Sequence, residues 1–186
     1  MILIRAAEAG DAAQITAIYT PHVAASAVSF ETEVPTTRAM RARMESSKGL
    51  YPWIVATSED RDTILGFAYA ARFREREAYR FCVETSIYVA GGLERQGVGR
   101  LLYEALIDTL RAQDFTQAIA VITLPNEASI ALHESVGFRR AGVYREVGWK
   151  QGRWHDVGIW QASLAEPNGP PDEPKRFADT GVRRDP

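Results

Sequence analysis

The spacing of apolar residues in the first half of the chain predicts two helices and three strands. After Asp11 the apolar residues follow the spacing of one helix face, and Pro21 is expected to kink or end this helix. Thr36 or Thr37 can cap a second helix that reaches about Ser47. Short apolar runs bounded by polar turns predict strands over residues 2–6, 53–57 and 64–71.

Longer apolar segments follow in the second half. The run from Cys82 to Val89 alternates and is rich in β-branched residues, which predicts a strand. A single apolar stripe predicts a helix from about Gly97 to Gln113. The same reasoning predicts a buried strand over 118–124, a helix from Asn126 to Gly137, and closing strands over 141–150 and 154–164. This order of elements indicates an α/β sheet.

Length and composition change the picture mainly at the C-terminus. The chain has 186 residues, 46% of them apolar and 25% charged, which is typical of one soluble globular domain. Five of the nine prolines fall in residues 166–186, together with several charges. We therefore expect a folded domain over residues 1–165 and a disordered tail over 166–186.

Charge and cysteine content exclude several classes of function. The net charge is −2, so we expect neither nucleic acid nor a membrane surface as a partner. The single cysteine, Cys82, and three scattered histidines fit neither a disulfide framework nor a zinc site, so no metal is expected. No signal peptide or long apolar run is recognisable, and we expect a cytoplasmic protein.

The segment Gln96-Gly97-Val98-Gly99-Arg100 has the features of an anion site at a helix start. The first N–H groups of a helix lack internal partners, glycine allows close approach, and Arg95 and Arg100 can pair with phosphate oxygens. The turn lacks the Gly-Lys-Ser/Thr of a P-loop, and Leu102 replaces the third glycine of a dinucleotide fingerprint. On its own, the pair of glycines can equally belong to an ordinary tight connection.

A second motif lies about 25 residues downstream. In the segment 125–138, Asn126, Ile130 and His133 share one helix face. The two motifs together resemble the GNAT superfamily of N-acetyltransferases, with its Gln/Arg-x-x-Gly-x-Gly/Ala turn and its later Asn-led helix ending in Gly-Phe. Within that superfamily the chain is similar to phosphinothricin and methionine sulfoximine acetyltransferases, through residues 76–79, 83–89, 132–134 and 152–158.

The resemblance implies a fold, a co-substrate and partners. It implies a mixed, mostly antiparallel sheet of about seven strands, flanked by about four helices and splayed between the fourth and fifth strands. It implies acetyl-CoA as co-substrate, a small amino-acid-like amine as acceptor, and a homodimer. A protein N-terminal or lysine acetyltransferase and a non-catalytic acyl-CoA-binding module are the alternative functions.

The coenzyme residues are expected on three segments. A pantetheine arm can bond to a strand edge as an added strand would. Asn126 can instead be a plain helix cap. Glu94 departs from the family pattern, which usually carries Gln or Arg at this position, and a carboxylate there would repel phosphate. The predicted coenzyme contacts are Ile87, Tyr88, Val89, Arg95, Gln96, Gly97, Val98, Gly99, Arg100, Asn126 and Ser129.

The catalytic residues are expected to be Glu84 and His133. The resemblance makes Glu84 the general base, and burial in an apolar strand would raise its pKa; the alternative is a carboxylate on a solvated sheet face. His133 can protonate the leaving thiolate, or it can be a hydrogen-bonded structural residue. By resemblance, the N–H of Val89 stabilises the oxyanion.

The charged loop before Cys82 is the candidate substrate site. Arg74, Arg76 and Tyr79 can bind a carboxylate or phosphinate, although alternating charges in such a loop are often only a solvated surface. Phe30 and Trp154 are possible aromatic walls of the site, with core packing as the alternative for each.

Overall fold

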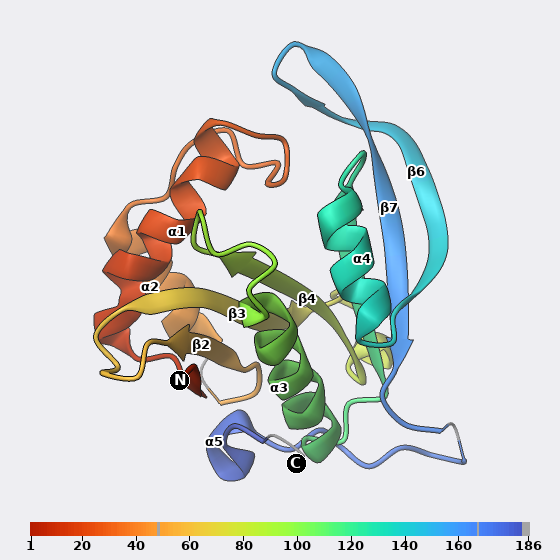
Figure 1. Cartoon of the computed structure of the whole chain (residues 1–186). Coiled ribbons are helices and arrows are strands. Elements are labelled where there is room, and N and C mark those ends of the chain that lie inside the picture. Colours follow the sequence, from red (N-terminus) through yellow and green to blue (C-terminus); the bar gives the residue numbers. More distant parts are fainter. Residues whose placement is uncertain (48, 167, 184–186) are drawn as a thin grey trace.

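A seven-stranded sheet in the order β1-β2-β3-β4-β5-β7-β6 forms the centre of the computed structural model (Figure 1). The structure describes residues 1–47, 49–166 and 168–183. Each neighbouring pair of strands is antiparallel except β4 and β5, which are parallel. The strands are β1 (Leu3–Ala6), β2 (Trp53–Thr57), β3 (Ile64–Arg72), β4 (Cys82–Val89), β5 (Gln117–Thr123), β6 (Arg139–Lys150) and β7 (Arg153–Ser163).

Helices cover both faces of the sheet. One apolar cluster joins α1 and α2 to alternate residues of β2 and β3, and a larger one joins α3 and α4 to the opposite face. The helices are α1 (Ala12–Ala24), α2 (Thr37–Ser46), α3 (Val98–Ala112), α4 (Glu127–Ser135) and α5 (Phe177–Thr180), with 3-10 turns at Ala9–Asp11 and Glu77–Tyr79. The predicted fold class is confirmed.

The splay predicted between the fourth and fifth strands lies halfway along β4. The parallel pairing of β4 with β5 runs from Cys82–Gln117 to Thr85–Ala120. Beyond that point β4 follows β3 as far as Val89, while β5 follows β7 as far as Thr123. Each strand keeps its antiparallel neighbour, and a gap opens between the two halves of the sheet.

The predicted start of α2 is confirmed, whereas α1 runs past the proline at which it was expected to kink or end. Thr36 caps α2, because its side-chain oxygen accepts a hydrogen bond from the N–H of Ala39 at 3.1 Å. Pro21 does not end α1, which continues to Ala24. Pro21 still supplies a carbonyl oxygen, which accepts the N–H of Ala25 at 2.9 Å, so the last turn remains hydrogen-bonded.

The C-terminal segment differs from the disordered tail that composition predicts. The N–H of Phe177 donates to the carbonyl of Gly49 at 2.7 Å, and Phe177 packs against the larger apolar cluster. Lys175 pairs with Asp114 at 2.8 Å. The side-chain amide of the buried Gln113 donates to the carbonyls of Leu50 and Lys175 at 2.6 and 2.8 Å. These long-range bonds tie residues 175–177 to the domain, and residues 167 and 184–186 of the predicted tail lie outside the described residues.

We predict that Gln113→Ala lowers the free energy of unfolding by about 2 kcal/mol, because two partly buried carbonyls lose a donor that comes from a buried side chain. Urea denaturation measures this change. Gln161→Ala is the matched control, since Gln161 makes its hydrogen bond at the exposed surface and should change stability by less than about 0.5 kcal/mol. Equal effects of the two substitutions would contradict the account of the tail.

Candidate active site

The free edge of β4 at the gap presents backbone hydrogen-bonding groups. The N–H of Ala90 donates to the carbonyl of Leu65 at 2.9 Å. These two residues lie next to Val89 and Gly66, the pair at the end of the β3–β4 ladder. Because alternate residues of an antiparallel strand point their backbone groups to opposite sides, Ile87 and Val89 direct theirs towards β5. The pairing with β5 has already ended at Thr85. The gap is therefore lined by strand-edge donors and acceptors that fit a chain of amides.

The start of α3 lies next to this edge. Gly97 adopts a left-handed conformation with φ of 85°, which glycine tolerates best. The N–H of Leu101 makes the first helical bond, to the carbonyl of Gly97 at 3.0 Å. The N–H groups of Val98, Gly99 and Arg100 precede that bond, so they are the unpaired donors of the helix start. This geometry is that of an anion site.

Gly99 fixes how closely the three elements of the site meet. A Cβ atom at this position would lie 3.1 Å from Cδ2 of Leu132 on α4 and 3.5 Å from Cγ2 of Val89 on β4. A larger residue would push the start of α3 away from the strand edge. Gly99 therefore brings the anion site and the amide edge together, a packing role in addition to the predicted approach to phosphate.

The polar side chains of the turn have partners within the chain. Arg100 pairs with Glu104 at 2.7 Å, both at the surface, and the Gln96 amide donates to the carbonyl of Gly92 at 2.9 Å. Arg95 is exposed, with φ of 62°. Arg95 and Arg100 therefore lie beside the helix start, and Arg100 bonds Glu104 through Nε alone.

Glu94, which departs from the family pattern, has its carboxylate near α1. Burial lowers the pKa of His22, and the negative charge of Glu94 opposes that shift. The His22 ring lies 5.1 Å from the ring of Tyr88. The Glu94 carboxylate is exposed, so solvent and salt screen its repulsion of an anion at the α3 start.

Asn126 and Ser129 form the first turn of α4. The Asn126 side-chain oxygen accepts the N–H of Ser129 at 3.1 Å, so the helix-cap role is present in the structure. The Ser129 hydroxyl lies 3.3 Å from Nδ1 of His133. A coenzyme contact by either residue would be made in addition to these bonds.

His133 is buried between α4 and α3. Its Nδ1 lies 2.6 Å from the carbonyl oxygen of Ser129, and a carbonyl can only accept, so Nδ1 carries the proton. In the neutral ring Nε2 is then an acceptor. Burial lowers the pKa of His133, and the rings of Tyr103 and Phe138 stand edge-to-face against it at 4.8 and 5.3 Å. These contacts favour the structural role over the general-acid role.

Glu84 lies half-buried on the opposite face of the sheet, beside the last paired residues of β4 and β5. Burial raises the pKa of its carboxyl, and the positive charge of Arg74 opposes this. Glu84 pairs with Ile119 on β5. Val121, two residues further along β5, is 46% exposed although β5 is a central strand. The gap therefore opens to solvent close to a carboxyl group whose pKa is raised by burial.

The predicted substrate residues lie in the loop between β3 and β4. The Arg74 guanidinium stacks over the ring of Phe73 at 4.4 Å and acts on Glu84. Tyr79 is exposed and stands edge-to-face with Phe73 at 5.7 Å. Arg76 is exposed at the start of the 3-10 turn. The loop thus brings Arg74 near the proposed base and leaves Arg76 and Tyr79 at its rim.

The two candidate aromatic walls are not core residues. Phe30 is 40% exposed and lies 6.1 Å from the His155 ring. Trp154 is 56% exposed and packs edge-to-face with Trp149 at 5.3 Å on the β6–β7 hairpin, which extends beyond the rest of the sheet (Figure 1).

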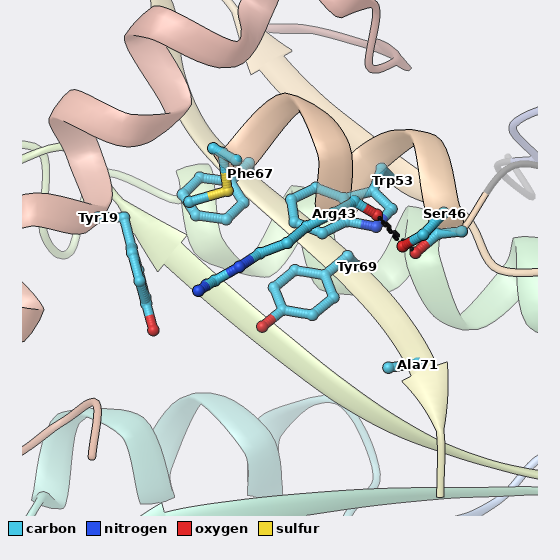
Figure 2. A pocket seen from close by; sticks show the side chains of 9 residues that line it. Tyr19, Arg43, Ser46, Trp53, Phe67, Tyr69 and Ala71 are labelled. Atoms are coloured by element: carbon cyan, nitrogen blue, oxygen red, sulfur yellow. Dashed lines mark hydrogen bonds between the residues drawn. The ribbon is translucent and has the colours of Figure 1, made fainter. Parts of the chain in front are cut away.

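A cavity missed by the sequence analysis lies on the same sheet face as Glu84. It has a volume of about 190 Å³ and lies between α2 and the aromatic residues of β2 and β3 (Figure 2). The alternation of Phe67, Tyr69 and Ala71 along β3 was the available signal. The lining residues are Tyr19, Met40, Arg43, Ser46, Ser47, Trp53, Phe67, Tyr69 and Ala71.

The described residues include neither a metal-binding group of side chains nor a helix suited to span a membrane. Across residues 1–47, 49–166 and 168–183, histidine, cysteine and carboxylate side chains form no group of three or more that could hold a metal ion. In the same part of the chain no helix combines the length and apolar character needed to cross a membrane.

An open mixed sheet, split beside a glycine-led helix start, defines a GNAT-type acetyltransferase fold. The family model described as "Acetyltransferase (GNAT) domain" matches residues 4–159, and the chain belongs to this family of N-acetyltransferases.

Within this family, the chain is similar to acetyltransferases named for phosphinothricin and for methionine sulfoximine. The phosphinothricin N-acetyltransferase of Streptomyces viridochromogenes is 39% identical over 167 residues, which is 90% of each chain. The L-methionine sulfoximine/L-methionine sulfone acetyltransferase of Salmonella typhimurium is 35% identical over 90% of this chain and 97% of its own. The crystal structure of a phosphinothricin acetyltransferase from Sinorhizobium meliloti in complex with acetyl-CoA is 36% identical, covers 98% of each chain and gives a TM-score of 0.87.

Arg74→Met should raise the pKa of Glu84 above its value in the unmodified protein, because the charge that opposes the effect of burial is removed. A carbon-13 NMR titration of the Glu84 carboxyl measures the change. Arg76→Met is the control and should leave this pKa unchanged. A pKa that stays constant or falls in Arg74→Met would show that Arg74 does not act on this carboxyl.

Proposed function

We propose that this protein transfers the acetyl group of acetyl-CoA to the amine of a small amino acid or analogue, of the phosphinothricin, methionine sulfoximine or methionine sulfone type. The observation that carries the proposal is the meeting of the β4 edge and the α3 start at the gap in the sheet. Relatives named for these acceptors and a solved relative that holds acetyl-CoA support it.

The residues at the gap fit the two chemical parts of the coenzyme. The backbone groups of Ile87 and Val89 can bond the pantetheine amides as a neighbouring strand would. The N–H groups of Val98, Gly99 and Arg100 can bind the pyrophosphate at the helix start. Gly99 keeps these two sites close enough for one extended ligand.

Glu84 is the proposed general base. Acetyl-CoA supplies the acetyl group as a thioester, and only a neutral amine has the lone pair to attack it. Glu84 accepts the proton of the ammonium, directly or through a water, and its raised pKa brings it nearer to the pH of the reaction. Arg74 is placed to pair with the acceptor carboxylate while it moderates that pKa.

Val89 and His133 have different proposed parts in the step. As the nitrogen–carbon bond forms and the carbon–sulfur bond breaks, the Val89 N–H that faces the gap donates to the carbonyl oxygen. The thiolate of the product can leave as the anion. Neutral His133 has an acceptor at Nε2, so we assign it to packing α4 against Tyr103 of α3, with its ring oriented by the Ser129 carbonyl.

A small acceptor is favoured over a peptide. The cavity next to Glu84 has about 190 Å³, below the ~300 Å³ at which ligand pockets usually begin, and suits one amino-acid side chain. The single cysteine fits a cytoplasmic protein, which we propose as the location. We also propose a homodimer that uses the exposed aromatic residues Trp149 and Trp154.

The purified protein should release free thiol from acetyl-CoA with at least one of phosphinothricin, methionine sulfoximine and methionine sulfone. Glu84→Gln should lower kcat by about 10²- to 10⁴-fold, the range of general-base catalysis. Glu45→Gln, exposed on α2, is the control and should keep full turnover. No turnover with any acceptor, despite tight coenzyme binding, would favour the non-catalytic alternative. Full turnover by Glu84→Gln would remove Glu84 as the base.

Light scattering should give the unmodified protein about twice the chain mass of 20.6 kDa. Replacing both Trp149 and Trp154 by serine should shift it to the monomer, because the apolar surface that favours association is removed. Val34→Ser changes an exposed apolar residue elsewhere and should keep the dimer. A dimer that survives the double substitution would place the interface on another surface.

A further inference from the structure

We propose that the cavity between α2 and the β2–β3 face receives the side chain of the acceptor, and that it selects an uncharged side chain over an anionic one. This role rests on the proposed function, and it explains how the protein would choose among amino-acid acceptors. The residues proposed to set this choice are Arg43, Glu31 and Tyr69. None of them is among the site residues predicted from the sequence.

One end of the cavity lies beside the strand position of the proposed catalytic carboxylate. Ala71, which lines it, is the register partner of Glu84, and Tyr69 is the partner of Ser86. Burial raises the pKa of the Tyr69 hydroxyl, and Ser86 and the charge of Glu84 also act on it. Ala71 and Tyr69 lie two residues apart on one strand face, about 7 Å. A methionine-sized side chain can span that length when its amine is held at Glu84.

The floor of the cavity is apolar and rigid. The rings of Trp53 and Tyr69 stack at 4.2 Å with an interplanar angle of 8°, and Phe67 continues the stack, 6.1 Å from Trp53 and nearly parallel to it. Met40 is buried against the same wall. A floor of aromatic rings and a thioether suits a methyl or methylene-rich side chain.

The cation at the mouth of the cavity is already neutralised. Arg43 extends from α2 between Tyr69 and Tyr19 (Figure 2). Its two terminal nitrogens donate to the two oxygens of Glu31 at 2.6 and 2.8 Å. Hydrogen bonding by Arg43 lowers the pKa of Glu31, so both groups are charged at neutral pH. An anionic side chain must then approach Glu31 in order to reach Arg43, which is unfavourable.

Neighbouring contacts hold Glu31 in this position. The Tyr19 hydroxyl donates to Glu31 at 2.8 Å and bonds the Ser29 hydroxyl at 2.7 Å. Lys150 of β6 donates to the carbonyls of Ser29 and Val23 at 2.7 and 2.6 Å. The β6–β7 hairpin thus fixes the loop that carries Glu31, and Glu31 in turn holds Arg43, which lines the cavity.

The inference therefore assigns the chemical class of the preferred acceptor. An α-amino acid with an uncharged side chain of methionine size, such as methionine sulfone, fits the apolar floor and the neutral ion pair. Phosphinothricin has a similar length but carries an anionic phosphinate. The unmodified protein should show a higher kcat/KM for methionine sulfone than for phosphinothricin.

Two substitutions in the ion pair test this with opposite signs. Glu31→Gln leaves the charge of Arg43 uncompensated and should shift the kcat/KM ratio about tenfold towards phosphinothricin. Arg43→Met leaves Glu31 as an unpaired anion and should shift the ratio away from phosphinothricin. A purely structural pair would instead move both ratios in the same direction, since either substitution breaks it. Arg41→Met and Glu45→Gln on the exposed side of α2 should not change the ratio.

The outcomes separate this inference from the proposed function. Turnover with opposite shifts in the two variants supports the cavity as the selector of side-chain charge. A preference of the unmodified protein for phosphinothricin contradicts it. So do kcat/KM ratios that shift in the same direction in both variants or do not shift. Each of these results leaves the acetyltransferase proposal intact. Absence of turnover with every acceptor in the unmodified protein contradicts the proposed function itself.

Discussion

The end of hydrogen bonding between β4 and β5 after Thr85 and Ala120 is the constraint on which the site depends. β4 continues along β3 because Gly66 leaves room there: a Cβ atom at that position would lie 2.8 Å from the carbonyl oxygen of Tyr88. β5 continues along β7 to Thr123. The sheet therefore stays hydrogen-bonded in two halves, and backbone groups remain free where the halves part.

The gap separates two kinds of chemistry on the two faces of the sheet. On the α3–α4 side, Gly99 places the unpaired N–H groups of the helix start next to the strand edge. On the α1–α2 side lie Glu84, with its raised pKa, and the aromatic cavity. An acyl donor and an amine acceptor can then meet from opposite faces, and neither must displace the other.

Periodicity and caps were sufficient to predict the strands and the four main helices, because burial against one sheet imposes regular apolar spacing. The path of α1 past Pro21 and the ordered tail were not predicted. The tail is held by Gln113 and Gly49, residues more than 60 positions away, and composition carries no information about such partners. For the same reason the pairing of Arg43 with Glu31 was missed, whereas the turn at Gly97, which is local in sequence, was found.

Amide hydrogen exchange of the β4 backbone tests the central claim most directly. The account predicts that coenzyme A slows exchange at the N–H groups of Ile87 and Val89, which face the gap. The N–H of Ala90, already bonded to Leu65, should change little. Equal exchange at Ile87 and Val89 with and without saturating coenzyme would contradict the assignment of the gap as the coenzyme site.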